Sequence, residues 1–552
     1  MTTPQFPGRP NLEQLKQQAK DLLRSARARQ PDALARFHAL PAFANHTDAA
    51  LAALPLALHD AQSVVARERG LPSWNALRER IAELTLEFDG AVAQFTRGSV
   101  EDRLARAERA LALFPDLIAK NFHAALAYGD AAAVERFLAA DSAGAASPAL
   151  AIRRGGPLNW EPLLYVAHSR WAAKNSAGLV ATARLLLERG ADPNTAYPWQ
   201  GDPKQPLSAL WAAACHSRHL ALAQLLLEAG AKPDDGESVY HAAEHGDVAM
   251  LDLLAAHGAQ PDGGAGSGTW GNTPLYFILG HYAGMAHDAD VRRGAAWLLD
   301  HGADPNRICY PDTTGETPVH AAARHWDAPM MELLHQHGAK LRARRADGRT
   351  AFALASLHGR VDIVDWLRAH DGADELSGAE RFLAACARGD RAKVDAMLRA
   401  EPKLRDIAQQ PGPQKLFFEI AGRRDPAALE TMLACGFDPL LTDAMGATAL
   451  HWAAFTGNPA AARLLLAAGA RTDVRDHTYR SPPLGWADYA ATNHTNPHGD
   501  FAGVARLLLA AGAPLPADEE LENWGSEEII ALVLAERRRR AAGGAEISDG
   551  PS

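Results

Sequence analysis

Residues 317–323 read Thr-Pro-Val-His-Ala-Ala-Ala, and residues 448–454 read Thr-Ala-Leu-His-Trp-Ala-Ala. Each stretch precedes a Gly-Ala step, Gly338-Ala339 or Gly469-Ala470, by about 20 residues. Related blocks recur along most of the chain of 552 residues. A block of this length that repeats predicts a stack of helix pairs with hairpin tips and no single globular core.

The end of each block carries a recognisable helix stop. Gly190-Ala-Asp-Pro-Asn194 and Gly302-Ala-Asp-Pro-Asn306 are identical, and each follows an apolar run. Glycine suits a helix end that needs a left-handed residue, and the proline that follows stops the helix. The upstream segments are rich in alanine and too short to be stable alone, so stacking must stabilise them.

This pattern resembles the ankyrin repeat, whose signature is Thr-Pro-Leu-His-x-Ala-Ala followed later by Gly-Ala-Asp. Thr273-Pro-Leu275 is a further match, and the resemblance spans roughly residues 120–515. It implies an all-α ankyrin-repeat solenoid of about eleven stacked helix-turn-helix units with β-hairpin tips, preceded by an N-terminal helical cap. Residues 379–401 and 415–440 lack the signature, so we expect degenerate units there. The sequence leaves two alternatives open, a continuous array or one that breaks at a hinge near 379–440.

We divide the chain into four regions. They are a helical leader at 1–90, an array with loop insertions at 91–375, a second part of the array at 376–515, and a C-terminal helix with a disordered basic and glycine-rich tail at 516–552. The leader places Leu12, Leu15 and Leu22 on one helical face and resembles the leaders of many bacterial ankyrin proteins. We expect it to cap the first repeat; an independent binding module is the alternative.

Composition narrows the class of protein. A formal net charge of −10 and 22% charged residues give no basic face for nucleic acid. The four cysteines are far apart, and no stretch is apolar enough to cross a membrane or to act as a secretion signal. We therefore expect a cytoplasmic monomer. Phosphate-binding, nucleophile-elbow and kinase motifs are missing, so no cofactor or metal is expected.

One inner-helix position carries histidine in several units in succession. Eight residues after the signature threonine, the chain has Ser169, His216, His245, His281, His325 and His358. Capping of the last carbonyls of the inner helix is the favoured interpretation, and a polar stripe that contacts a ligand is the alternative. A single metal cannot bridge the column, because neighbouring helices lie about 10 Å apart and zinc–nitrogen bonds are ~2 Å.

His241, Glu244 and His245 form the densest polar group. Spacings of three and four place them on one helical face. The spelling His-x-x-Glu-His resembles an inverted zinc-protease helix, but these positions are the groove-facing slots of the repeat. A satisfied His–Glu pair and a ligand-contacting acid–base cluster both remain open. If the protein is an enzyme, these three residues are the candidate catalytic groups.

The loops of this region are unusually long and aromatic, which is typical of functional loops. The aromatic residues either pack on neighbouring repeats or overhang the groove and narrow it into a pocket around residues 160–330. The candidate ligand-binding residues are Tyr165, His168, Trp199, His216, His241, Glu244, His245, Trp270, His281, Arg324 and His325. A second patch comprises Trp452, Phe455, Trp486, Asp488 and Tyr489, which are residue types common at protein interfaces.

Two hypotheses follow. In the first, the chain is an interaction scaffold that binds a protein partner through its concave groove. In the second, it is a small-molecule-binding protein, or an enzyme of the hydrolase or isomerase type, whose histidine-rich pocket lies at residues 160–330. A scaffold predicts a broad open groove, whereas a ligand-binding protein predicts one deep cavity closed by the long loops.

Overall fold

The computed structural model describes residues 11–40, 43–54, 56–101, 103–142, 149–263, 271–280, 288–423, 425–493, 496, 498–521 and 524–545. Two of the predicted site residues, Trp270 and His281, lie outside these ranges. The chain forms two compact units. One comprises residues 1–86, 357–359 and 376–552, and the other comprises residues 87–356 and 360–375.

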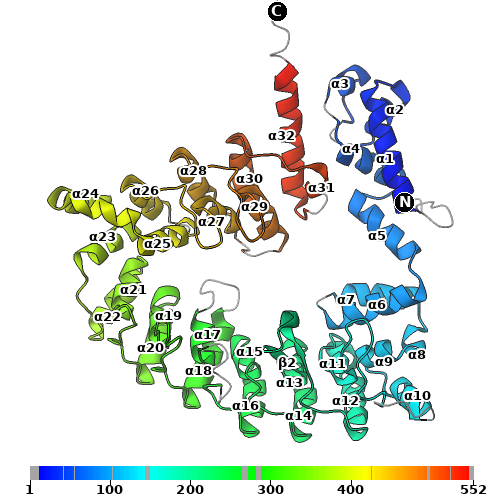
Figure 1. The fold of residues 1–552 in the computed structure, drawn as a ribbon, viewed down its shortest axis with the longest axis horizontal. Helices are drawn as coiled ribbons and strands as arrows, with labels where there is room; N and C mark the ends of the chain where they lie inside the picture. Colours follow the sequence, from blue (N-terminus) through cyan, green and yellow to red (C-terminus); the bar gives the residue numbers. More distant parts are fainter. Residues whose placement is uncertain are drawn as a thin grey trace, which may run out of the picture. The chain divides into compact units, whose positions relative to one another are not determined.

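The unit formed by residues 87–356 and 360–375 is a row of helix pairs (Figure 1). Its elements are α6 (Phe88–Val100), α7 (Leu104–Leu113), α8 (Leu117–Lys120), α9 (Phe122–Tyr128), α10 (Ala131–Ser142), α11 (Pro162–Ala167), α12 (Ala172–Glu188), β1 (Ala196–Pro198), η1 (Trp199–Gly201), β2 (Pro206–Ser208), α13 (Ala209–Trp211), η2 (Ala212–His216), α14 (Leu220–Glu228), α15 (Ser238–Glu244), α16 (Val248–Ala256), α17 (Pro274–Gly280), α18 (Asp288–Asp300), α19 (Pro318–His325), α20 (Ala328–Gln336), α21 (Ala351–Leu357) and α22 (Val361–Ala369).

Each pair consists of a short inner helix, such as α15 or α19, and the outer helix that follows it, such as α16 or α20. Strands β1 and β2 pair antiparallel and form one hairpin tip, and Cys309 and Glu316 form an isolated bridge at another. The helix pairs and the hairpin tips confirm the predicted ankyrin-repeat solenoid.

The helix stop predicted from Gly-Ala-x-Pro-Asn has a structural reason. Gly190 and Gly302 have φ values of 90° and 95°, in the left-handed region that glycine adopts without strain. Asn306 then joins two repeats: its Nδ2 donates to the carbonyl of Gly338 (3.0 Å), and its Oδ1 accepts from the amide of Lys340 (2.7 Å). Asn194 makes the same two bonds to Gly230 and Lys232.

The histidine of the Thr-Pro-Val-His signature also joins neighbouring repeats. His320 Nδ1 lies 2.9 Å from Thr317 Oγ1 and accepts from the Thr317 amide (3.1 Å), so it fixes the start of α19. Its Nε2–H donates to the carbonyl of Ala343 in the next repeat (3.0 Å). The signature is therefore a device for helix capping and repeat stacking, and its presence says little about the ligand.

Outer helices are linked by a second set of contacts. Trp297 Nε1 donates to Asp252 Oδ1 of the preceding outer helix (2.7 Å). His337 Nε2 lies 3.1 Å from Asp300 Oδ1 in the same relation, one repeat further along. These side chains are committed to stacking.

The unit formed by residues 1–86, 357–359 and 376–552 holds the leader and the C-terminal repeats. Its elements are α1 (Leu12–Arg27), α2 (Pro31–Phe37), α3 (Asp48–Ala53), α4 (Leu58–Glu68), α5 (Trp74–Leu84), α23 (Gly378–Ala387), α24 (Arg391–Ala400), η4 (Pro402–Gln409), α25 (Pro411–Ala421), α26 (Pro426–Ala434), α27 (Ala449–Phe455), α28 (Pro459–Ala467), α29 (Pro483–Thr492), α30 (Phe501–Ala510), α31 (Asp518–Leu521) and α32 (Glu527–Ala545).

The units without the signature still form helix pairs, α23 with α24 and α25 with α26. Ser377 replaces the signature threonine by capping α23, since its hydroxyl accepts from the Glu380 amide (3.2 Å). The leader has its own apolar core, which includes Phe37 and Val64. Its role as a cap on the first repeat and the four region boundaries stay predictions, and the two alternatives for residues 379–440, a continuous array or a hinge, stay open.

Candidate functional site

A cavity of about 430 Å³ lies on the inner helices of two successive repeats, α13–η2 and α15. Its lining residues are Arg170, Trp211, Cys215, His216, Arg218, His241, Glu244 and His245. Four of these, His216, His241, Glu244 and His245, belong to the set predicted from the sequence. The structure thus brings the densest predicted polar group together with one histidine of the preceding repeat.

The backbone is irregular where it forms this cavity. Ser208 stands 22 positions before Gly230, whereas Thr317 stands 21 positions before Gly338, so this repeat has one additional residue. The additional residue is accommodated in a π-helical turn, η2. Such single π-turns inside helices are frequent at functional sites.

The extra residue also places an arginine where other repeats have glycine. Gly246 and Gly359 follow their inner helices with φ values of 56° and 66°, and Arg218 holds the equivalent place with φ 52°. A left-handed conformation is costly for a residue with a Cβ and is retained where the surroundings or the function require it. The side chain held in this way, Arg218, lines the cavity.

Trp211 occupies the position of the signature histidine, three residues after the Ser208 cap. In other repeats the residue at that position bonds to the next repeat, as His320 does through Ala343. The indole N–H of Trp211 is buried and has no hydrogen-bond partner among the described residues. Trp211 therefore contributes an apolar wall to the cavity without the stacking bond that its position usually makes.

His241 is held between two carboxylates. Its Nδ1–H donates to Glu244 Oε2 (2.8 Å), and its Nε2 lies 3.4 Å from Glu237 Oε2. Burial alone lowers the pKa of His241, but the hydrogen bonds to Glu237 and Glu244 outweigh it and raise the pKa to about 9. An imidazole with both nitrogens facing carboxylates carries a proton on each, so His241 is a cation at neutral pH.

His216 is held between a backbone carbonyl and an arginine side chain. Its Nε2–H donates to the carbonyl of Val100 (2.7 Å), and its Nδ1 faces the Arg170 guanidinium at 3.5 Å. A guanidinium can only donate, so Nδ1 is the acceptor in this pair. Arg170 also donates to the carbonyl of His216 (2.5 Å) and is fixed at the cavity wall.

The protonation states of His241 and Cys215 limit the chemistry of the cavity. His241 already carries its proton at neutral pH and does not act as a general base there. Burial raises the pKa of the Cys215 thiol well above its usual value, and the thiol donates to the carbonyl of Ser238 (3.4 Å). A protonated thiol is a poor nucleophile. The arrangement suits binding of a polar group better than proton transfer or covalent catalysis.

Three other predicted residues of the groove lie outside the cavity lining. Tyr165 is fully buried, and its hydroxyl donates to the carbonyl of Gly155 (2.8 Å). His168 is buried among aromatic rings; burial, and next the charge of His216, lower its pKa to about 3. Trp199 is 42% exposed in the short turn η1. Tyr165 and His168 support the walls and do not present their polar groups to a ligand.

Arg324 belongs to a buried ion cluster. It donates twice to the carboxylate of Glu316, at 2.5 and 2.7 Å. The same carboxylate accepts from Arg345 (2.5 Å) and from the Tyr276 hydroxyl (2.5 Å). This cluster fixes the hairpin tip against α19, so the structure gives Arg324 a stacking role. His325, at the end of α19, is not a lining residue of the cavity.

Two of the loop aromatics, Trp171 and Tyr197, pack on neighbouring elements. Trp171 stacks on Phe95 with a centroid distance of 5.8 Å, and its Nε1 donates to Ser99 Oγ (2.8 Å). Tyr197 lies against Trp160 at 4.6 Å. Of the two alternatives for these loops, packing accounts for Trp171 and Tyr197.

The second predicted patch lies in the other unit and is divided in its roles. Trp452, Phe455 and Trp486 contact one another with ring centroids 5.4 to 6.1 Å apart. Asp488 is buried, and its carboxylate accepts from the amides of Gly525 (3.3 Å) and Ser526 (3.0 Å) before α32. Tyr489 is 60% exposed. Asp488 therefore fixes the last helix, while the aromatic rings form a packed cluster.

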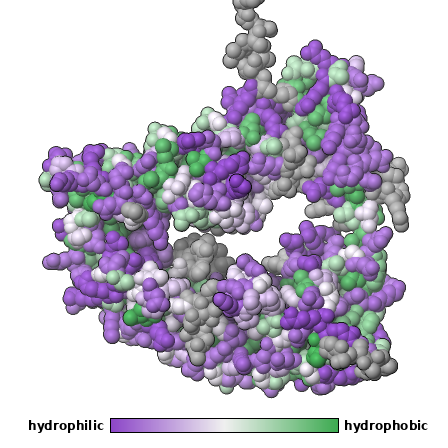
Figure 2. All heavy atoms as spheres, in the orientation of Figure 1, coloured by the Kyte–Doolittle hydropathy of each residue, from purple (hydrophilic) through white to green (hydrophobic). Residues whose placement is uncertain are grey.

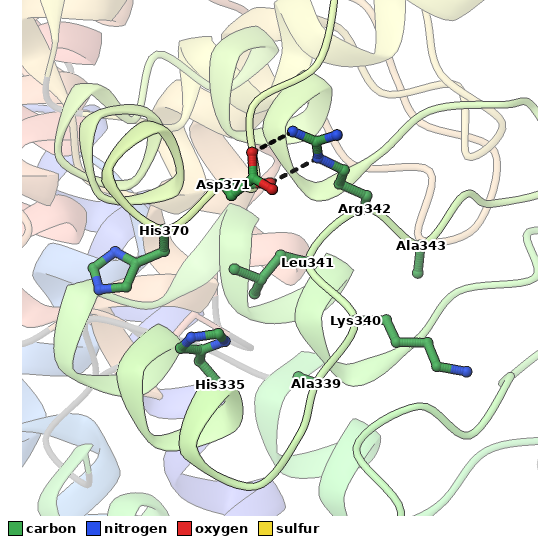
Figure 3. A pocket seen from close by; sticks show the side chains of 8 residues that line it. All are labelled: His335, Ala339, Lys340, Leu341, Arg342, Ala343, His370 and Asp371. Carbon is green, nitrogen blue, oxygen red and sulfur yellow. Dashed lines mark hydrogen bonds and ion pairs between the residues drawn. The ribbon is translucent and has the colours of Figure 1, made fainter.

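A second cavity, of about 460 Å³, opens between the ends of the outer helices α20 and α22. Figure 3 shows the Arg342 guanidinium against Asp371, with His335 and His370 on the adjoining helix ends. Two of the charged side chains that line it are paired with each other: Arg342 Nη2 lies 2.6 Å from Asp371 Oδ1. No predicted site residue lies in it.

The face drawn in Figure 2 shows no large apolar patch among the described residues. The side of the molecule drawn in Figure 2 is mostly hydrophilic, with apolar residues in small scattered groups. Across the described ranges, no helix combines the length and apolarity required to cross a membrane. In the same ranges, no three His, Cys, Asp or Glu side chains gather in an arrangement that could hold a metal ion.

Sequence reasoning missed half of the cavity lining, namely Arg170, Trp211, Cys215 and Arg218. The sequence holds one signal that could have identified Trp211 and Arg218, namely the extra residue between Ser208 and Gly230. Nothing comparable marks Arg170, because its place depends on the carbonyl of His216.

Comparison with known proteins identifies the family. A family model of ankyrin repeats in three copies matches residues 281–377, and a model of the single ankyrin repeat matches residues 445–477. Human cyclin-dependent kinase inhibitor 2A is 34% identical over 144 residues, which are 26% of this chain and 83% of that protein. Human cyclin-dependent kinase 4 inhibitor B is 33% identical over 136 residues, 25% of this chain and 88% of that protein. Among solved structures, the human ASB11 ankyrin repeat domain aligns over 47% of this chain and all of its own length, with 23% identity and a TM-score of 0.34. From the signature stretches, the stacked helix pairs, the family models and the two kinase inhibitors, the chain belongs to the ankyrin-repeat proteins.

Proposed function

We propose that this protein is an interaction scaffold that binds a protein partner through the inner-helix surface around α13–η2 and α15. The cavity between these helices is the observation that carries the proposal, because its lining departs from the repeat pattern. Trp211 replaces the signature histidine, and Arg218 replaces the left-handed glycine. Departures that add nothing to stacking are expected where a surface is used for binding.

The residue types support a protein partner. Tryptophan and arginine are the side chains most often found at the energetic centre of protein interfaces. The matched kinase inhibitors are named for their action on another protein, and an ankyrin array in this chain is proposed to act through a protein contact as well.

Site-specific photo-crosslinking tests this proposal. A benzophenone amino acid is placed at His245 in the cavity lining and, as a matched control, at Gln224 on the exposed side of the outer helix α14. The proposal predicts one discrete adduct, identified by mass spectrometry, from position 245 and none from position 224. Equal labelling at both positions, or labelling at 224 alone, would show that the partner does not dock on the inner helices.

A small-molecule ligand is the second candidate, favoured by the size of the cavity. About 430 Å³ lies within the range of ~300–1,000 Å³ typical of ligand pockets. A thermal-shift screen against metabolites tests it, because a ligand of the native state raises the unfolding midpoint by mass action. A hit that disappears in Glu244→Ala and His245→Ala would support this candidate, and a flat response in the whole library would reject it.

A further inference from the structure

We propose that the cavity between η2 and α15 takes the carboxylate of an aspartate or glutamate side chain on the protein partner, with Arg218 as its principal ligand. This inference rests on the proposed scaffold function and names the chemistry that the partner must present. The charged side chains in and around the cavity differ in whether they already have a hydrogen-bond or ion-pair partner.

The acidic groups near the cavity all have partners. Glu237 and Glu244 share the protonated His241, at 3.4 and 2.8 Å. Asp235 accepts from the hydroxyls of Ser208 (2.6 Å) and Ser238 (2.7 Å). These bonds hold the three carboxylates in place within the repeats. Because each carboxylate already has a partner, it attracts a cationic ligand only weakly.

Asp247, the remaining nearby acid, accepts from the Met250 amide (3.2 Å) and caps α16. Like the others, it has a structural task.

The basic groups differ. The Arg170 guanidinium donates to the carbonyl of His216 and is held at the cavity wall. Arg218 is exposed, and the structure gives its side chain no hydrogen bond or ion pair within the described residues. Arginine presents two parallel N–H donors that match the two oxygens of a carboxylate. The Arg218 guanidinium therefore offers hydrogen-bond donors to a ligand, and their geometry suits a planar anion such as a carboxylate.

The conformation of Arg218 explains why the arginine stands there. The same place holds Gly246 in the next repeat, with φ 56°, where glycine removes the strain. The chain instead has an arginine with φ 52°, and the π-turn before it adds the residue that makes room. We infer that the partner's carboxylate binds Arg218 while the methylene groups of the same acidic side chain lie against the Trp211 ring. Binding of this kind accounts for both residues that depart from the repeat pattern, Trp211 and Arg218.

The test begins with peptides selected from a displayed random library against the full chain. Binding is then measured by fluorescence anisotropy with the best peptide and with its Glu→Gln or Asp→Asn form. We expect an acidic residue at one fixed position and about tenfold weaker binding of the amide form, corresponding to about 1.4 kcal/mol. Arg218→Gly should weaken the acidic peptide by a similar factor and leave the amide peptide unchanged.

Arg218→Gly is chosen because glycine suits the left-handed place, so the variant keeps its fold. Arg189→Gly is the matched control, since Arg189 is an exposed arginine at the end of α12, away from the cavity lining. Its binding should equal that of the unchanged chain.

Selected peptides without a fixed acidic residue, or equal binding of the acidic peptide to Arg218→Gly, would overturn the inference. The crosslink at position 245 would then still support the scaffold function, so the two failures can be told apart. A missing crosslink at 245 would reject both.

Discussion

The buried carboxylate of Glu316 offers the sharpest test of how the repeats are held together. Its side chain is 4% exposed, and it accepts hydrogen bonds from Arg324, Arg345 and Tyr276. Glu316→Gln removes the negative charge with little change of shape. Arg324 and Arg345, at 16% and 15% side-chain exposure, then carry two positive charges with one shared partner lost.

Glu316→Gln should lower the free energy of unfolding by a large amount, although it replaces only one carboxylate oxygen by an NH2 group. Breaking a buried ion pair by removing one member typically costs about 3–5 kcal/mol, because the remaining charge is poorly solvated. The pKa of Glu316 gives a second route to the magnitude. Burial raises it, but the bonds and charge of Arg324, with Tyr276 and Arg345, lower it from 4.5 to about 2. A difference of that size corresponds to about 3 kcal/mol.

The sign of the pH dependence follows from the lowered pKa. The contribution of Glu316 to stability is fully present above pH 4.5 and is lost as the pH falls through about 2. Native-state hydrogen exchange of the α19 amides measures the effect, because repeat arrays open locally and one unfolding midpoint averages over many repeats. The Gln variant should open α19 about 3 kcal/mol more easily at neutral pH.

An exposed pair supplies the control. Asp365 lies 2.8 Å from Arg368, and both side chains are more than half exposed. Asp365→Asn should change stability by about 0–1 kcal/mol, as surface pairs usually do. If Glu316→Gln costs no more than Asp365→Asn, the buried cluster does not stabilise the array, and the reasoning from burial and pairing is refuted.

Three further predictions follow from single contacts. The imidazole of His241 should titrate near pH 9 in NMR spectra, and its stabilising contribution should be complete below pH 6.5 and lost as the pH rises through 9; a midpoint near 6.5 would contradict the pairing with Glu237 and Glu244. Asn306→Ala should cost about 1–3 kcal/mol in urea unfolding, since it leaves the Lys340 amide and the Gly338 carbonyl without their partner, and no change would remove the inter-repeat bond from the account. Asp488→Ala should raise the exchange rate of the first α32 amides while α19 stays unchanged, and equal rates would contradict its role at Gly525 and Ser526.

Much of the fold could be predicted because the same residue types make the same hydrogen bonds between neighbouring repeats. Asn306 and His320 are bound to neighbouring repeats by backbone groups that every repeat provides, so their identity alone predicts the contact. The degenerate units also fold as pairs, since Ser377 can cap a helix as threonine does. Local chemistry repeated at fixed spacing is what a single sequence reports best.

The candidate site was only partly predictable. His216, His241, Glu244 and His245 share the inner-helix face, which spacing alone predicts. The protonation of His241 depends on Glu237, four residues earlier, and on burial, which spacing does not give. The histidine column also does not share one role, because His216 bonds to Val100 while His358 accepts from Arg423. Whether the lining residues bind a ligand stays a prediction.

Hydrogen exchange of the whole chain with its crosslinked partner bound tests the central claim most directly. The account predicts slower exchange in the inner helices at residues 209–218 and 238–246, with the outer helices 220–228 and 248–256 unchanged. Protection concentrated on those outer helices would contradict a binding surface built on the cavity of Trp211, Arg218 and His241.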